Sequence, residues 1–80
     1  MRIPIPMPKM GYDMTKGTVV RWLVEIGDPV TRGQPIAEIE TDKVVIEMES
    51  LATGRLVEIL QGPESEVAVG VVIGYLDDGT

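Results

Sequence analysis

Near the middle of the chain stands the stretch Ala37-Glu38-Ile39-Glu40-Thr41-Asp42-Lys43-Val44-Val45-Ile46-Glu47-Met48-Glu49. On both sides of Asp42 and Lys43 every second side chain belongs to one apolar row, which is the pattern of strands with one buried face. Folding the stretch back at these two residues gives three inner pairs: Thr41 with Val44, Ile39 with Ile46, and Ala37 with Met48. A slip of one residue would send Ile39 and Ile46 to opposite faces, so the pattern predicts a two-residue hairpin turn with Lys43 at its tip.

Composition limits the chain to one small, strand-built domain. A chain of 80 residues buries only about 60% of its unfolded surface, which leaves no room for a deep catalytic pocket. The sequence has no Cys and no His, which excludes disulfides, thiolate nucleophiles, the usual zinc sites and a histidine relay. We therefore expect a single domain over residues 1–80 with no catalytic residue and no metal site.

Charge and hydropathy exclude further classes. The formal net charge is −6, from 13 acidic and 7 basic residues, which disfavours nucleic-acid binding because phosphate contacts need a basic face. No apolar stretch approaches the roughly 18 residues of a membrane span, so we expect a soluble, cytoplasmic protein without membrane contact. Five of the acids surround Lys43 in sequence: Glu38, Glu40, Asp42, Glu47 and Glu49. They are either the solvated face of the strands or a recognition surface, and Glu38 opposite Glu47 is a mildly unfavourable pair.

The two halves of the chain repeat each other. A shift of 37 positions aligns similar residues: Gly17 with Gly54, Val20 with Val57, Val30 with Val67, Gly33 with Gly70, Ile36 with Ile73, and Ile39 with Leu76. Short strands separated by glycine and proline turns indicate an all-β sandwich or flattened barrel with internal pseudo-two-fold symmetry. In such an arrangement the Lys43 hairpin lies at one end and both termini at the other. Gly27 aligns with Glu64, so we expect a different backbone path in the second turn.

Two large side chains are assigned to the core because they continue an alternating row of apolar residues along their strands. Trp22 lies in phase with Val20 and Val24, and Met48 lies in phase with Ile46. Both are therefore expected to pack inside and not to form a ligand platform.

Four sequence motifs precede or include the hairpin. In chain order they are Pro6-Met7-Pro8-Lys9-Met10-Gly11, Met14-Thr15-Lys16-Gly17-Thr18-Val19-Val20-Arg21-Trp22-Leu23-Val24, Gly27-Asp28-Pro29-Val30, and Gly33 through Lys43. In this order, over nearly the whole chain, they resemble the lipoyl domains of the acyltransferase (E2) components of 2-oxo acid dehydrogenase complexes, within the biotinyl/lipoyl family. The resemblance implies two four-stranded antiparallel sheets. It is broken at Pro63-Glu64-Ser65, where the family commonly has Glu-Gly-Glu or Glu-Gly-Asp.

The resemblance implies a cofactor, lipoic acid, joined by an amide bond to Lys43. It further implies a swinging-arm carrier that shuttles acyl groups and reducing equivalents among three partners: a thiamin-diphosphate-dependent decarboxylase (E1), the acyltransferase core (E2) and dihydrolipoyl dehydrogenase (E3). A lipoate ligase or lipoyl transferase would attach the cofactor. In the family, the loop that matches Lys9 through Lys16 contributes to partner recognition, and here it carries Met10, Tyr12 and Met14.

Other interpretations of Lys43 remain open. Biotin carriers share the fold but usually flank their lysine with methionines, whereas Lys43 lies between Asp42 and Val44. An unmodified structural hairpin module is an alternative from a different class. A Schiff-base enzyme is disfavoured because an exposed lysine keeps a pKa near its reference value of about 10.4 unless an apolar pocket lowers it. The residues do not choose among pyruvate, 2-oxoglutarate, branched-chain and acetoin systems.

Overall fold

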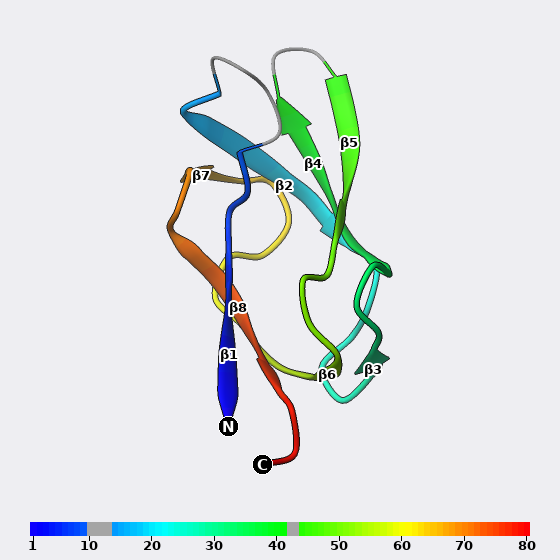
Figure 1. Cartoon of the computed structure of the whole chain (residues 1–80). Coiled ribbons are helices and arrows are strands. Elements are labelled where there is room, and N and C mark those ends of the chain that lie inside the picture. The colour runs from blue at the N-terminus through cyan, green and yellow to red at the C-terminus, as the bar shows by residue number, and fades with distance from the viewer. Residues whose placement is uncertain (10–13, 42–43) are drawn as a thin grey trace.

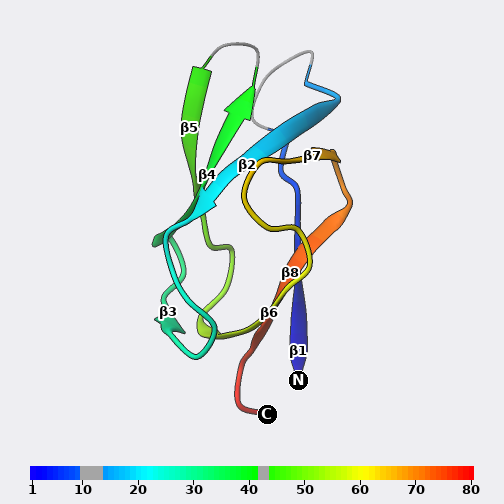
Figure 2. The same cartoon turned by 180° about the vertical axis from the view of Figure 1, so that it is seen from behind.

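The computed structural model describes residues 1–9, 14–41 and 44–80, which fold into eight strands in two antiparallel sheets (Figure 1). The strands are β1 (Arg2–Pro6), β2 (Lys16–Trp22), β3 (Pro29–Val30), β4 (Pro35–Thr41), β5 (Val44–Glu49), β6 (Gly54–Ile59), β7 (Ser65–Ala68) and β8 (Val72–Asp77). One sheet has the order β1-β8-β6-β3 and the other the order β5-β4-β2-β7. Seen from both sides (Figures 1 and 2), the sheets form a sandwich. They do not close into a barrel, so the sandwich form of the prediction is the correct one.

The predicted two-fold symmetry is visible in the strand order. Strands β5, β4, β2 and β7 of one sheet correspond in order to β1, β8, β6 and β3 of the other. The turns correspond as well, because Gly33 and Gly70 have φ angles of 88° and 92°. The N–H of Gly33 donates to the Ser50 carbonyl at 2.8 Å, and the N–H of Gly70 donates to the Met7 carbonyl at 3.0 Å.

The core consists of apolar side chains that the two sheets turn toward each other. Its buried members are Ile5, Met7, Val19, Val24, Val30, Ile36, Ala37, Ile39, Met48, Leu56, Val67, Ile73 and Leu76. Met48 is thus buried as predicted. Val19, and not Val20, is the buried valine of β2, because the register of β2 against β4 shifts between Val19 and Arg21. This bulge adds one residue and changes the phase that strict alternation predicts.

Trp22 is half-buried and packs against the core, which confirms its predicted place. Its indole Nε1–H donates to the Gln61 carbonyl at 2.9 Å, so the polar edge of the ring has a partner. A methyl group built on Gly74 would lie 3.1 Å from Cη2 of Trp22. The ring therefore occupies space that a side chain at Gly74 would need, and it ties the two sheets together.

The second turn does not take the different path that its sequence predicts. Glu64 adopts a left-handed φ of 64° at the position that matches Gly27, whose φ is 99°. The prediction fails because the hydrogen bond from the Glu64 N–H to the Val19 carbonyl, equivalent to that from Gly27 to Leu56, keeps the same turn without the glycine.

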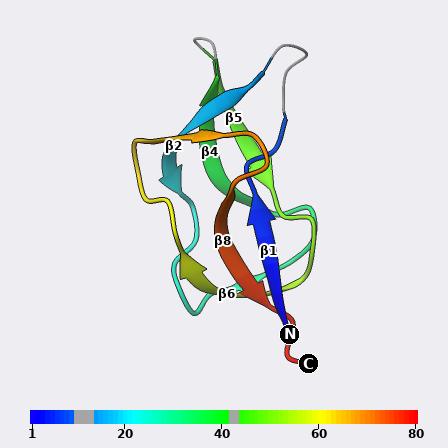
Figure 3. The ribbon, with the colours of Figure 1, turned by 90° about the vertical axis from the view of Figure 1, so that its left-hand side faces the viewer.

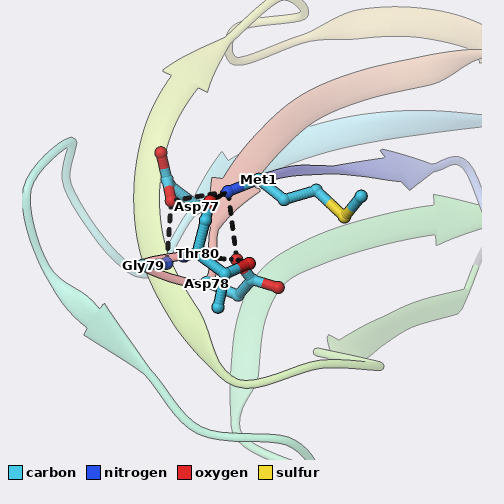
Figure 4. A network of polar contacts seen from close by, with 5 residues as sticks. All are labelled: Met1, Asp77, Asp78, Gly79 and Thr80. Atoms are coloured by element: carbon cyan, nitrogen blue, oxygen red, sulfur yellow. Dashed lines mark hydrogen bonds and ion pairs between the residues drawn. The ribbon is translucent and has the colours of Figure 1, made fainter.

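The end of the β4–β5 hairpin lies opposite the two chain termini, as expected (Figures 1 and 3). At the terminal end, the Asp78 N–H donates to the Met1 carbonyl at 3.1 Å, and the Met1 amino group contacts the Asp77 and Asp78 carboxylates (Figure 4). No helix that could cross a membrane occurs in the described part of the chain.

Candidate functional site

The predicted register of the central hairpin is confirmed. Strands β4 and β5 pair Ala37 with Met48, Glu38 with Glu47, Ile39 with Ile46, Glu40 with Val45, and Thr41 with Val44. Lys43 and Asp42, the predicted site residues, lie outside the described residues. Their flanking residues Thr41 and Val44 are directly paired, so the connection between the two strands contains two residues.

The apolar interior ends before the hairpin does. Along β5, Met48 is buried, Ile46 is half-buried and Val44 has 54% of its surface exposed. Val45, on the outer face, is 51% exposed. The inner row therefore runs out of the sandwich toward the tip, and the residues next to the candidate lysine stand in solvent.

The outer face of the hairpin is acidic. Arg21, on β2, places its Nε 2.6 Å from the Glu38 carboxylate, which relieves the unfavourable pairing of Glu38 with Glu47. The hairpin sequence alone gives no sign of this arginine, because β2 is distant from it in the chain. Glu40, Glu47 and Glu49 are exposed and take no part in the ion pairs found among the described residues.

The segment from Lys9 to Lys16 is described only in part. Met10 and Tyr12, two of the predicted recognition residues, lie outside the described residues. Met14 is half-buried and packs against the core, with its Cε 2.7 Å from where a Cβ of Gly17 would lie. It therefore anchors the end of this segment to the core, and a role of Met14 in partner recognition stays a prediction.

The structure has a small apolar pocket at a distance from the end of the β4–β5 hairpin that precedes Val44. This pocket is lined by Ile3 and Ile5 of β1 and by Met48 and Ser50 near the end of β5. Ser50 is buried, and its Oγ donates to the Ala52 carbonyl at 2.6 Å, so the hydroxyl has a structural partner. Within residues 1–9, 14–41 and 44–80, no group of His, Cys, Asp or Glu side chains could hold a metal ion.

The two sheets, their pseudo-two-fold symmetry and the exposed end of the β4–β5 pairing at Val44 and Val45 define a small antiparallel β-sandwich domain. Residues 3–76 match a biotin/lipoyl family profile with the description "Biotin-requiring enzyme". The chain belongs to this family.

Two longer relatives and one solved structure show where similar domains occur. The chain is 40% identical over 92% of its length to the dihydrolipoyllysine-residue acetyltransferase component of the pyruvate dehydrogenase complex of Corynebacterium glutamicum. It is 37% identical over 98% of its length to the corresponding component of the acetoin cleaving system of Bacillus subtilis. The lipoyl domain of the 2-oxoglutarate dehydrogenase complex of Azotobacter vinelandii superimposes with a TM-score of 0.76 at 36% identity, over 98% of this chain and 99% of that domain.

The chain spans only 11% and 20% of the length of these two relatives. In contrast, it covers nearly all of the solved lipoyl domain. The similarity therefore concerns the lipoyl domain of such acyltransferase components, and the fold is that of this domain.

Proposed function

We propose that Lys43 is the attachment residue of the domain and that it carries lipoic acid through an amide bond. The observation that supports this most directly is the pairing of Thr41 with Val44, which leaves Asp42 and Lys43 as the whole connection between β4 and β5. The exposure of Val44 and Val45 supports an accessible tip. A tethered cofactor fits such a tip because the covalent bond replaces the enclosed pocket that a dissociable ligand requires.

The chain's own residues position the cofactor and do not react. The antiparallel pairing of β4 with β5 and the buried Ile39 beneath it form a stiff support for the hairpin. When bound, the lipoyl group supplies a disulfide that accepts electrons and acyl groups, chemistry for which this cysteine-free chain has no side chain. Amide formation removes the positive charge of Lys43 and leaves the carboxylates of Glu40 and Glu47 as the nearby charges of the outer face.

The same proposal covers the biological role. Residues 1–80 are one non-catalytic carrier domain that moves acyl groups and reducing equivalents among the E1, E2 and E3 sites of a 2-oxo acid or acetoin dehydrogenase complex in the cytoplasm, after modification by a lipoate ligase or lipoyl transferase. Support comes from the acyltransferase relatives, whose names specify pyruvate and acetoin systems. Because identities to these different systems are similar, the acyl group is left open.

The test is intact-mass measurement of the purified chain after incubation with lipoate, ATP and a lipoate ligase. Lys43→Ala should remove the mass gain, whereas Lys16→Ala should keep it, because Lys16 is exposed but stands in an ion pair with Glu66 on another strand. A parallel incubation with biotin and a biotin ligase tests the sister function.

Each outcome is decisive. Exclusive biotinylation would assign the domain to the biotin carriers. No modification by either enzyme, in a chain with intact sheet structure, would favour the unmodified structural module. Modification that survives Lys43→Ala would show that another lysine is the site.

A further inference from the structure

Each sheet has one long edge strand, β5 in one and β1 in the other, and hydrogen bonds fix which way their N–H groups point. The Ser50 N–H donates to the Gln34 carbonyl at 2.9 Å, toward β4, and the Met7 N–H donates to the Val71 carbonyl at 2.8 Å, toward β8. In an antiparallel pair, alternate residues of an edge strand direct their N–H groups to the neighbour and the others direct them outward.

Every second residue before Ser50 and before Met7 directs its N–H toward the neighbouring strand. The residues between them direct their N–H positions away from the sheet, and we call these the outward positions of each edge. On β5 they are Val45, Glu47 and Glu49, and each of these residues has an N–H. On β1 they are Arg2, Pro4 and Pro6, of which the two prolines have none. The two-fold symmetry matches these positions one to one, Pro4 with Glu47 and Pro6 with Glu49.

The remaining edges are short. Strand β3 has two residues and β7 has four, and short edge strands pair poorly with another chain. Among the described strands, β5 is therefore the long edge with a continuous row of outward donors. Prolines close the equivalent edge, so the sandwich fold itself does not require this row.

The charge on the β5 edge selects what can pair with it. Glu47 and Glu49 are exposed and stand in none of the ion pairs of the described residues. Pairing of β5 with β5 of a second copy would bring these carboxylates together, which is unfavourable. An incoming strand with Lys or Arg at every second position would instead place opposite charges beside them.

We propose that the β5 edge binds an extended basic segment of a partner protein by strand addition. The segment's backbone pairs with the outward groups of Val45, Glu47 and Glu49, and its basic side chains lie on the face of the two carboxylates. The edge begins next to the hairpin tip, so the segment docks beside the candidate attachment residue. This interaction does not depend on modification of Lys43.

The test uses the unmodified, ¹⁵N-labelled chain and a blocked peptide of alternating lysine and valine. Binding should shift the amide resonances of Val45, Glu47 and Glu49 and slow their hydrogen exchange. Two control peptides carry N-methyl groups, one on all lysines and the other on all valines. At least one of them should lose binding, because one set of peptide N–H groups must face β5. Undiminished binding of both control peptides, shifts centred on β1, or no shifts at millimolar peptide would overturn the proposal.

Two kinds of variant distinguish the contribution of the backbone N–H groups of β5 from that of its carboxylate charges. Glu47→Pro removes one outward N–H and should weaken binding about tenfold or more, since a lost interface hydrogen bond and a steric block act together. The fold accepts proline at the matching Pro4, and Glu49→Pro, matching Pro6, is a second variant if the first misfolds. The double variant E47Q/E49Q keeps the N–H groups and should weaken binding most at low salt, whereas exposed Glu25→Gln should leave it unchanged. Wild-type affinity in both folded proline variants, or self-association of the chain through β5, would contradict the proposal.

Discussion

Gly27 and Glu64 make the same turn in the two halves of the domain. The Gly27 N–H donates to the Leu56 carbonyl at 2.7 Å, and the Glu64 N–H donates to the Val19 carbonyl at 2.5 Å. Each bond continues the pairing of a short edge strand with its neighbour in the same sheet, β3 with β6 and β7 with β2, and each donor has a left-handed φ. Only Gly27 adopts this conformation without steric cost.

A glycine in place of Glu64 should therefore stabilise the folded protein. We expect Glu64→Gly to raise the free energy of unfolding by about 0.5–1 kcal/mol, because relief of left-handed strain exceeds the added chain entropy of glycine. Thermal or urea unfolding measures the change. Gly27→Ala is the reciprocal variant and should lower stability by about 1 kcal/mol through conformation alone, since a Cβ added at Gly27 would meet nothing within 4 Å. A loss of stability in Glu64→Gly would show that the turn needs the glutamate side chain.

The contact between Trp22 and Gly74 predicts a strong packing effect. A Cβ at Gly74 would lie 2.7 Å from the Glu58 carbonyl oxygen and 3.1 Å from the Trp22 ring. Gly74→Ala should cost about 1–3 kcal/mol and change the emission of Trp22, the single tryptophan of the chain. Gly62→Ala is the matched control, because its Cβ meets nothing within 4 Å and stability should stay level or rise by about 0.4–1 kcal/mol. Equal effects of the two substitutions would refute the packing argument.

Arg21 should stabilise the hairpin because its ion pair with Glu38 reduces the repulsion between Glu38 and Glu47. Its side chain is 63% exposed, so solvent screens the ion pair with Glu38, and Arg21→Gln should cost no more than about 1 kcal/mol, with a smaller effect at high salt. In the double variant R21Q/E47Q, removal of the facing carboxylate should recover part of the loss. A double-mutant cycle at two salt concentrations checks this, and strict additivity would argue against coupling of the two residues.

The terminal contacts predict a mild dependence of stability on pH. Hydrogen bonds from the Thr80 hydroxyl and N–H, at 2.7 and 3.0 Å, together with the Met1 ammonium group, lower the pKa of Asp78 from 3.8 to about 2 (Figure 4). The contribution of Asp78 is therefore complete above pH 3.8 and lost as the pH falls toward 2.

The Met1 amino group follows the opposite sign. Its hydrogen bond to Asp78 raises its pKa above 8.0, so its contribution is complete below pH 8.0 and lost as the pH rises through the folded value. Unfolding of the 80-residue chain between about pH 2 and 10 should show both losses, and Asp78→Asn should flatten them. An unchanged pH profile in this variant would rule out the contact in solution.

The hairpin register was predictable because two apolar rows coincide in only one alignment, in which Ile39 faces Ile46. The repeat was predictable from the aligned residues of the two halves, of which Gly33 and Gly70 make equivalent turns. The phase of Val20 was not, because a bulge leaves no mark in the alternation until the partner strand is known. The turn at Glu64 was missed because a hydrogen bond to the carbonyl of Val19, distant in the chain, overrides the local preference of glutamate. The candidate site was predicted at Lys43, which lies outside the described residues and stays a prediction.

The bond between Asp78 and Met1 occupies in one half the place that the Thr41–Val44 pair occupies in the other. The two sheets thus end in the same kind of strand pairing, which the chain connects at Thr41 and Val44 and leaves unconnected at Met1 and Asp78. A circular permutant, joined from Thr80 to Met1 and cut between Thr41 and Val44, would keep every layer of the interior. We expect this permutant to fold, in which case the connection between β4 and β5 is set by the chemistry that it carries and not by the needs of the fold.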